Sequence, residues 1–152
     1  MASILGLQTN ISYLTIPGAL FLALLPRVYS GFTGPGKQYL DKNNPRTFYE
    51  TLGKADLDKK TKNRLQRAES AVANAFETLG LYAAAVTAGN AAGLSTEIMN
   101  SLSIGYLTLR VFYTWIYIWG QENRKFAPLR TLVWGAHMAL VMSMFVMAGW
   151  KA

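Results

Sequence analysis

The stretch RLQRAESAVANAFETLGLYAAAVTAGNAA, residues 64–92, decides how this chain folds. Its first half mixes charged residues with alanines, which are strong helix formers, and from Thr78 onward it is uncharged. Asp58 lies just upstream and is a suitable N-cap. Because about 20 apolar residues are enough for a helix to cross roughly 30 Å of hydrocarbon, we predict one long helix that continues into a membrane.

Three further segments are long and apolar enough to span a bilayer. Residues 1–26 carry no charge, Ile98–Gln121 is interrupted only by Arg110, and Thr131–Trp150 is uncharged. A cleaved signal peptide is the alternative for the first segment, which however lacks the basic start of such a peptide. The sequence thus predicts an all-α fold, an integral membrane four-helix bundle that forms a single domain over residues 1–152, with spans at about 8–29, 64–92, 97–121 and 128–150 and a loop at about 30–63.

Charge is scarce in this chain and gathers on one side of the predicted bundle. Of 152 residues, 51% are hydrophobic and 15% are charged, against about 25% in soluble domains. The net charge is +7, and most of the basic residues lie between Arg27 and Arg67 or between Arg124 and Arg130. Four spans bring both segments to one side, which the positive-inside rule makes cytosolic. The positive charge therefore indicates the orientation of the chain in the membrane. No nucleic-acid partner is expected, because aromatic and basic residues are not interleaved.

The absence of cysteine and the single histidine exclude several kinds of chemistry. Without cysteine there is no disulfide, no thiolate metal site and no cysteine nucleophile, so any thiol must arrive with a ligand. With His137 alone, multi-histidine metal sites are excluded and no metal is expected. We interpret His137 as a satisfied histidine at a helix interface rather than as a catalytic base.

Polar residues inside the second and third spans form two stripes. At about 100° per residue, the members of each stripe share one face of their helix. The stripe on the second span consists of Arg67, Ser70, Asn74 and Glu77, and that on the third consists of Tyr106, Arg110, Tyr113, Tyr117, Gln121 and Arg124.

Two interpretations of these stripes remain open. In the first, Glu77 and Arg110 form a buried ion pair that locks the two helices together while the tyrosines pack as core. In the second, the stripes bind a ligand that has carboxylates and an amine, because arginine forks bind carboxylates and Glu77 can accept an ammonium group.

Two motifs carry a resemblance to a known family. The first is Arg67-Ala68 followed by Ala71, Asn74 and Glu77, continuing into LYAAAV at residues 81–86. The second is Arg110-x-x-Tyr113-x-x-x-Tyr117. Together with a basic residue near the start of the last span, they resemble the MAPEG superfamily, the membrane-associated proteins in eicosanoid and glutathione metabolism. The resemblance covers nearly the whole chain and is closest to the microsomal glutathione transferases.

The resemblance implies a homotrimer that binds glutathione as a cosubstrate between neighbouring subunits near the cytosolic face. It implies that Asn74 and Glu77 hold the glutamyl and amino end, and that Arg110, Tyr113 and Tyr117 hold carboxylates and backbone. Arg67 is expected to belong to the same glutathione-binding set. Ser70 departs from the pattern, because the eicosanoid enzymes have a basic residue there.

The resemblance also implies an arginine that stabilises the thiolate, and two residues are candidates. We favour Arg130 over Arg124 as the catalytic residue, because Pro128 fits the first turn of the fourth span and makes the backbone around Arg130 rigid. Arg124 lies where the third span ends, and its side chain is expected to reach toward the lipid headgroups.

The expected function is that of a membrane-bound glutathione transferase or peroxidase of the endoplasmic reticulum. It would conjugate the glutathione thiolate to lipophilic electrophiles or reduce lipid hydroperoxides, with membrane lipids and a lipophilic small molecule as partners. The alternative is a non-catalytic, lipid-binding membrane scaffold of the same fold.

Overall fold

The computed structural model describes residues 9–152, apart from the side chain of Arg124, and its described part contains helices and turns but no strand. The longer helices are α1 (Thr15–Arg27), α2 (Phe48–Lys54), α3 (Lys59–Ala91), α4 (Thr96–Ile118) and α5 (Ala127–Lys151). Short 3-10 or π-helical turns extend several of their ends. A long helix therefore lies in each of the four segments that were predicted to span a membrane.

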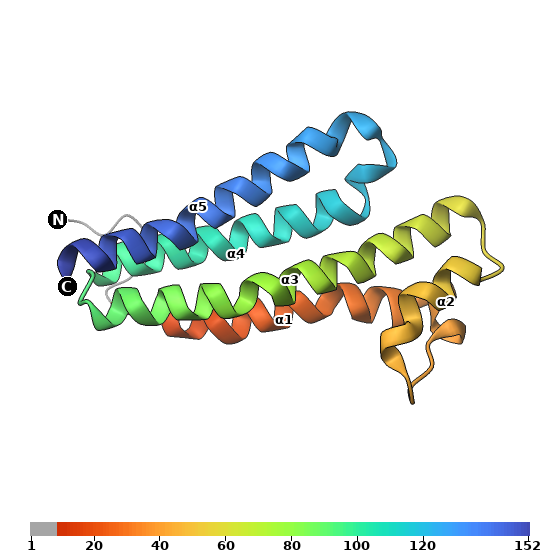
Figure 1. Ribbon diagram of the computed structural model, residues 1–152, viewed down its shortest axis with the longest axis horizontal. Helices are drawn as coiled ribbons and strands as arrows, with labels where there is room; N and C mark the ends of the chain where they lie inside the picture. Colours follow the sequence, from red (N-terminus) through yellow and green to blue (C-terminus); the bar gives the residue numbers. More distant parts are fainter. Residues whose placement is uncertain (1–8) are drawn as a thin grey trace.

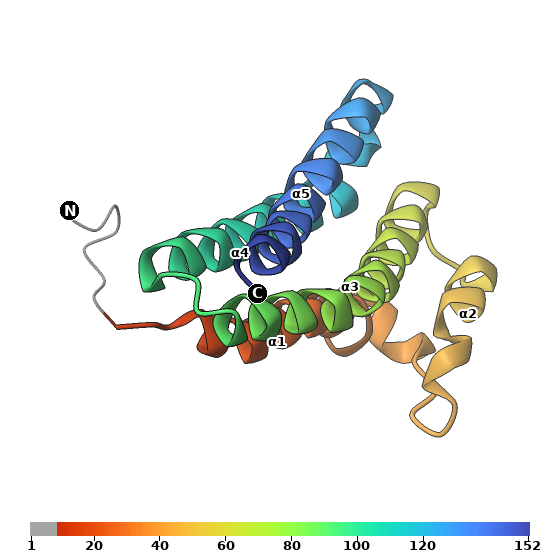
Figure 2. The same cartoon turned by 60° about the vertical axis from the view of Figure 1, so that its left-hand side comes forward.

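The four long helices pack side by side (Figure 1). The central helix is α3, which contacts α1, α4 and α5, while α4 also packs along α1 and α5. Figures 1 and 2 both show that α4 and α5 diverge from α3 toward the end of the molecule that carries α2.

The start of α3 is set by its N-cap, as the sequence predicts. The Asp58 carboxylate accepts a hydrogen bond of 3.0 Å from the backbone N–H of Thr61, which satisfies a free amide of the first turn. At 1.5 Å per residue, the 33 residues of α3 extend for about 50 Å, well beyond a hydrocarbon layer of about 30 Å. The first turns of α3 are therefore expected outside the hydrocarbon.

Two helical segments of the described chain are long and apolar enough, by length and composition, to cross a membrane. They are Ser12–Phe32, which includes α1, and Ala127–Lys151, which is α5. The other two long helices, α3 and α4, carry most of the polar groups that face the interior. Membrane crossing by α3 and α4 stays a prediction from the sequence.

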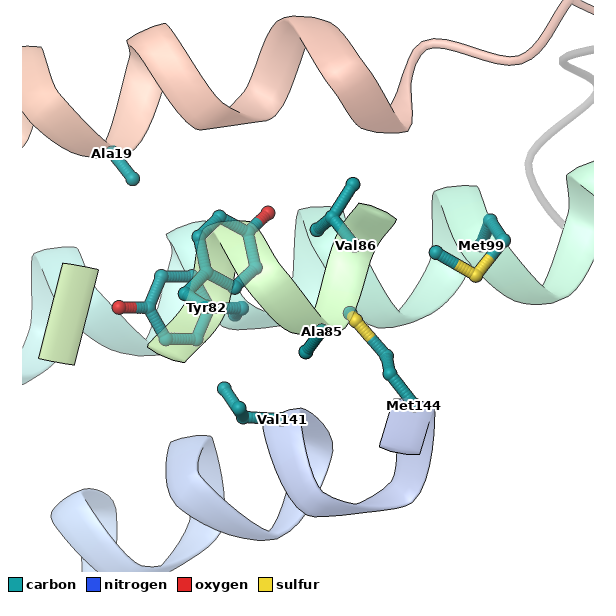
Figure 3. Close-up of a cluster of buried hydrophobic side chains, with 8 residues drawn as sticks. Ala19, Tyr82, Ala85, Val86, Met99, Val141 and Met144 are labelled. Atoms are coloured by element: carbon teal, nitrogen blue, oxygen red, sulfur yellow. The ribbon is translucent and has the colours of Figure 1, made fainter. Parts of the chain in front are cut away.

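The apolar core gathers buried side chains of α1, α3, α4 and α5 (Figure 3). Tyr82 of α3 and Tyr106 of α4 stack there, with ring centroids 3.7 Å apart, and Val141 and Met144 of α5 are fully buried beside them. The Tyr82 hydroxyl lies 2.5 Å from Thr15 Oγ1, so the buried phenol has a polar partner. This core joins the four helices at one end.

A buried ion pair ties α1 to α3 closer to the other end. The Glu69 carboxylate lies 2.6 Å from Arg27 Nη2 and accepts a 2.5 Å hydrogen bond from Ser30 Oγ. On α3, Asn74 of the candidate site lies between this ion pair and the apolar core.

Candidate functional site

A pocket of about 270 Å³ lies between the first half of α3, the second half of α4 and the start of α5. The residues that line it are polar or aromatic: Asn74, Tyr113, Tyr117, Arg130, Thr131 and Trp134. The structure thus brings Asn74 of the first stripe, Tyr113 and Tyr117 of the second stripe, and Arg130 to one pocket.

Arg110 lies directly behind the pocket wall, with 4% of its surface exposed. Its Nη1 donates to Asn74 Oδ1 over 3.1 Å and lies 3.3 Å from Nε2 of His137. The Tyr113 ring covers the guanidinium, with its centroid 5.0 Å from Cζ. Within residues 9–152, no carboxylate lies within ion-pair distance of Arg110. A buried cation with only neutral partners is costly, which favours a site that receives an anion.

Glu77 does not form the ion pair with Arg110 that one interpretation of the sequence required. Its side chain is exposed on the outer surface of α3, one turn beyond Asn74. Among the residues that the structure describes, no basic group pairs with Glu77. The ion-pair interpretation is therefore wrong for the isolated chain, because the Glu77 side chain lies on the outer surface while Arg110 points inward.

Arg67 lies outside the pocket, although the sequence stripe placed it with Asn74. Its Nε donates to the carbonyl of Ile118 over 3.0 Å and so occupies a free acceptor at the end of α4. Its Nη2 is 3.8 Å from Glu122, whose carboxylate also accepts from Arg64 and pairs with Lys60. The Arg64 hydrogen bond holds the pKa of Glu122 below its usual range. In this chain Arg67 fastens α3 to the end of α4.

Arg130 extends into the pocket from the first turn of α5. Pro128 occupies one of the first two positions of this helix, as predicted, and fixes the backbone just before Arg130. The guanidinium lies over the ring of Tyr117, with 4.9 Å between Cζ and the ring centroid. The side chain of the alternative residue, Arg124, lies outside the described residues. Arg130 is thus the basic side chain that lines the described pocket.

Thr131 and Trp134 line the pocket but were not predicted from the sequence, and His137 was predicted only as a helix-interface residue. Trp134 comes four residues after Arg130, and His137 comes three residues after Trp134. A helical wheel would therefore have placed all three on one face. His137 is fully buried and contacts Arg110, so it is part of the polar site as well as of the helix interface.

Comparison with known families gives one match. The profile described as the MAPEG family matches residues 11–150 of the 152-residue chain, a range that contains every residue of the pocket. Searches of curated proteins and of solved structures returned no match. The family match, together with two apolar helices of spanning length, supports a membrane protein with a general role in glutathione or eicosanoid metabolism. Since the match extends over nearly its whole length, the chain belongs to the MAPEG family.

Proposed function

We propose that this protein is a membrane-bound glutathione transferase or peroxidase, and that the pocket between α3, α4 and α5 holds glutathione. The observation that carries the proposal is the buried Arg110, whose partners Asn74 and His137 are neutral. Glutathione brings two carboxylates, which would supply the missing negative charge. The pocket surface offers further donors in the Arg130 guanidinium and the hydroxyls of Tyr113 and Tyr117.

Arg130 is the residue that we assign to the thiol. A free thiol has a pKa of about 8.5, so only a few per cent is thiolate at neutral pH, whereas lowering this pKa by about two units makes the thiolate the main form. A fixed cation beside the sulfur favours the charged form. The position of Arg130 on the first turn of a helix, over the Tyr117 ring, supports this role. The thiolate would then form a thioether with a lipophilic electrophile as the leaving group departs. With a lipid hydroperoxide it would break the O–O bond, releasing the lipid alcohol and leaving a glutathione sulfenic acid that a second glutathione converts to the disulfide and water.

A homotrimer would complete this site. The outer face of α3 carries the exposed Glu77 beside small exposed residues such as Gly80 and Ala84. Small residues allow helices to approach closely, and a carboxylate at membrane depth needs a polar partner. We propose that a neighbouring subunit covers this face and that Glu77 receives the amino group of glutathione there. In this arrangement α1, α3, α4 and α5 all cross the membrane of the endoplasmic reticulum, with the basic loops in the cytosol.

A second candidate function is that of a non-catalytic lipid-binding scaffold. An apolar groove of about 310 Å³ between α1 and α4 favours it, because such a surface fits an acyl chain. The groove is lined by Leu22, Leu25, Pro26, Tyr29, Val111, Thr114, Trp115, Ile118 and Trp119. It lies away from the polar pocket and shares no lining residue with it.

Conjugation of glutathione to chlorodinitrobenzene by the purified protein tests the proposal, with reduction of a lipid hydroperoxide as a parallel assay. A glutathione-dependent rate in either assay, reduced in Arg130→Ala, is the expected result. Glutathione binding without turnover in both assays would favour the scaffold. Failure to bind glutathione at all would contradict the proposed ligand.

A further inference from the structure

His137 lies in the middle of α5 with none of its surface exposed. Its ring is surrounded by the aromatic rings of Tyr106, Tyr113 and Trp134, whose centroids are 5.5, 5.7 and 6.2 Å away. The ring faces are therefore packed against aromatic side chains. The two ring nitrogens are the atoms through which His137 makes polar contacts.

The partners of the two nitrogens define the protonation of His137. Nδ1 lies 3.1 Å from the carbonyl oxygen of Val133, and because a carbonyl only accepts, Nδ1 carries the hydrogen. Nε2 lies 3.3 Å from Arg110 Nη1, and because a guanidinium only donates, Nε2 accepts. His137 is therefore neutral and protonated on Nδ1. Its one lone pair is already engaged, so it does not serve as a base for the ligand thiol.

The other partner of Arg110 Nη1 is the side-chain amide of Asn74. A guanidinium Nη has two hydrogens, and here one is directed at His137 Nε2 and the other at Asn74 Oδ1, 3.1 Å away. Because Oδ1 accepts from Arg110, the amide group left for the pocket is the donor Nδ2. Asn74 lines the pocket and is partly exposed there.

We propose that His137 is a positioning residue that orients the ligand-binding amide of Asn74 through Arg110. By accepting one Nη1 hydrogen, it fixes the guanidinium so that the other hydrogen holds Asn74 Oδ1 inward. The pocket then presents Asn74 as a donor beside the Arg130 guanidinium, a combination that selects a carboxylate over an ammonium group. The step from this arrangement to glutathione rests on the proposed function.

Calorimetric binding of glutathione to His137 variants tests the positioning role. His137→Leu removes the acceptor and is expected to weaken binding about tenfold, the worth of one hydrogen bond. In His137→Gln the side-chain oxygen can take the place of Nε2, so affinity within about threefold of the unchanged protein is expected. Ser143→Ala is the control on the same helix and should leave affinity unchanged, because among the described residues the half-buried Ser143 hydroxyl bonds only the carbonyl of Ala139.

A double-mutant cycle separates positioning from general packing. If His137 acts through Asn74, adding His137→Leu to Asn74→Ala should cost no further affinity, because the amide to be oriented is already gone. Full affinity in His137→Leu, or the same loss in both backgrounds, would overturn the proposal.

The nitrogen resonances of ¹⁵N-labelled His137 test the arrangement without any ligand. The expected spectrum shows a neutral ring with the hydrogen on Nδ1. A hydrogen on Nε2, or a doubly protonated ring, would overturn the proposal that His137 orients Asn74 through Arg110, whether or not glutathione binds. If the expected tautomer is found in a protein that binds no glutathione, the proposed function fails while the orientation of Asn74 stands.

Discussion

Arg110 carries a positive charge into the interior of the helices, and the side chains around it are neutral. Helical periodicity predicted that Arg110 shares a face with Tyr113 and Tyr117. It did not predict that Glu77 is exposed and does not pair with Arg110. A helical wheel gives the relative direction of side chains on one helix but not the rotation of that helix against its neighbours. Asn74, one turn earlier on α3, takes the place beside Arg110 that Glu77 was expected to fill.

Replacing Arg110 separates a ligand site from a structural ion pair. Arg110→Leu should weaken glutathione binding by about 1.5–3 kcal/mol, the worth of a charge-assisted hydrogen bond. It should leave the melting temperature within a few degrees, because no buried carboxylate is left without a partner. Calorimetry and thermal unfolding in detergent measure the two effects. An unfolded variant, or one with unchanged affinity, would contradict the account.

Arg130 should affect turnover more than binding. Arg130→Ala is expected to reduce kcat by about tenfold or more with little change in the KM for glutathione, because a cation beside the sulfur stabilises charge during reaction. Steady-state conjugation rates at varied glutathione concentrations measure this. Lys125→Ala, an exposed change in the preceding turn, is the control and should keep the original rate. Equal losses in both variants would show that general positive charge, and not Arg130, matters.

Among the elements, the four long helices could be predicted because each contains a long uncharged or nearly uncharged segment, and two of them have a clear start signal. Asp58 caps α3, and Pro128 lies in the first turn of α5, as the sequence indicates. The contacts between helices were much less predictable. Arg67, which the resemblance assigns to the ligand, donates from Nε to the end of α4, a contact that the sequence did not indicate. The pairing of Arg27 with Glu69 was not predicted because the two residues are far apart in the sequence.

The Arg27–Glu69 pair should stabilise the junction of α1 and α3. Arg27→Met leaves the Glu69 carboxylate buried without its cation and is expected to cost about 3 kcal/mol of unfolding free energy. Adding Glu69→Gln should recover part of that loss, because the neutral amide can still bind Ser30. Denaturant unfolding of the two single variants and the double variant measures the coupling. Additive losses would show that the pair is not coupled.

The loop after α4 should respond to acid. The hydrogen bond from Arg64 lowers the pKa of Glu122 from its ordinary value of 4.5, so the unfolded chain takes up a proton more readily than the folded one. The stabilisation is therefore complete above pH 4.5 and is lost as the pH falls through the lower, folded value. Thermal unfolding at a series of pH values should show a smaller acid loss in Glu122→Gln, while the exposed Glu50→Gln serves as control. Identical pH profiles of the unchanged protein and Glu122→Gln would show that Glu122 does not contribute to the acid dependence of stability.

For the whole molecule, we expect a neighbouring subunit to cover the exposed face of α3. Glu77 and Gly80 lie on that face, and a lone subunit would present them to lipid. Native mass spectrometry from mild detergent should find three copies of the 16.8 kDa chain. Gly80→Leu should weaken this assembly, because a bulky side chain keeps helices apart, whereas Val146→Leu on the exposed side of α5 should not. A stable monomer would remove the proposed role of the neighbouring subunit.

The central claim is that the pocket beside Arg110 and Arg130 binds glutathione as its thiolate. Titration of the purified protein with glutathione, followed by the ultraviolet absorbance of the thiolate, tests it most directly. The account predicts a saturable thiolate signal at neutral pH that is abolished by competition with a thiol-free analogue such as S-hexylglutathione and is lost in Arg130→Ala. Absence of saturable binding, or a bound thiol that stays protonated in the unchanged protein, would contradict it.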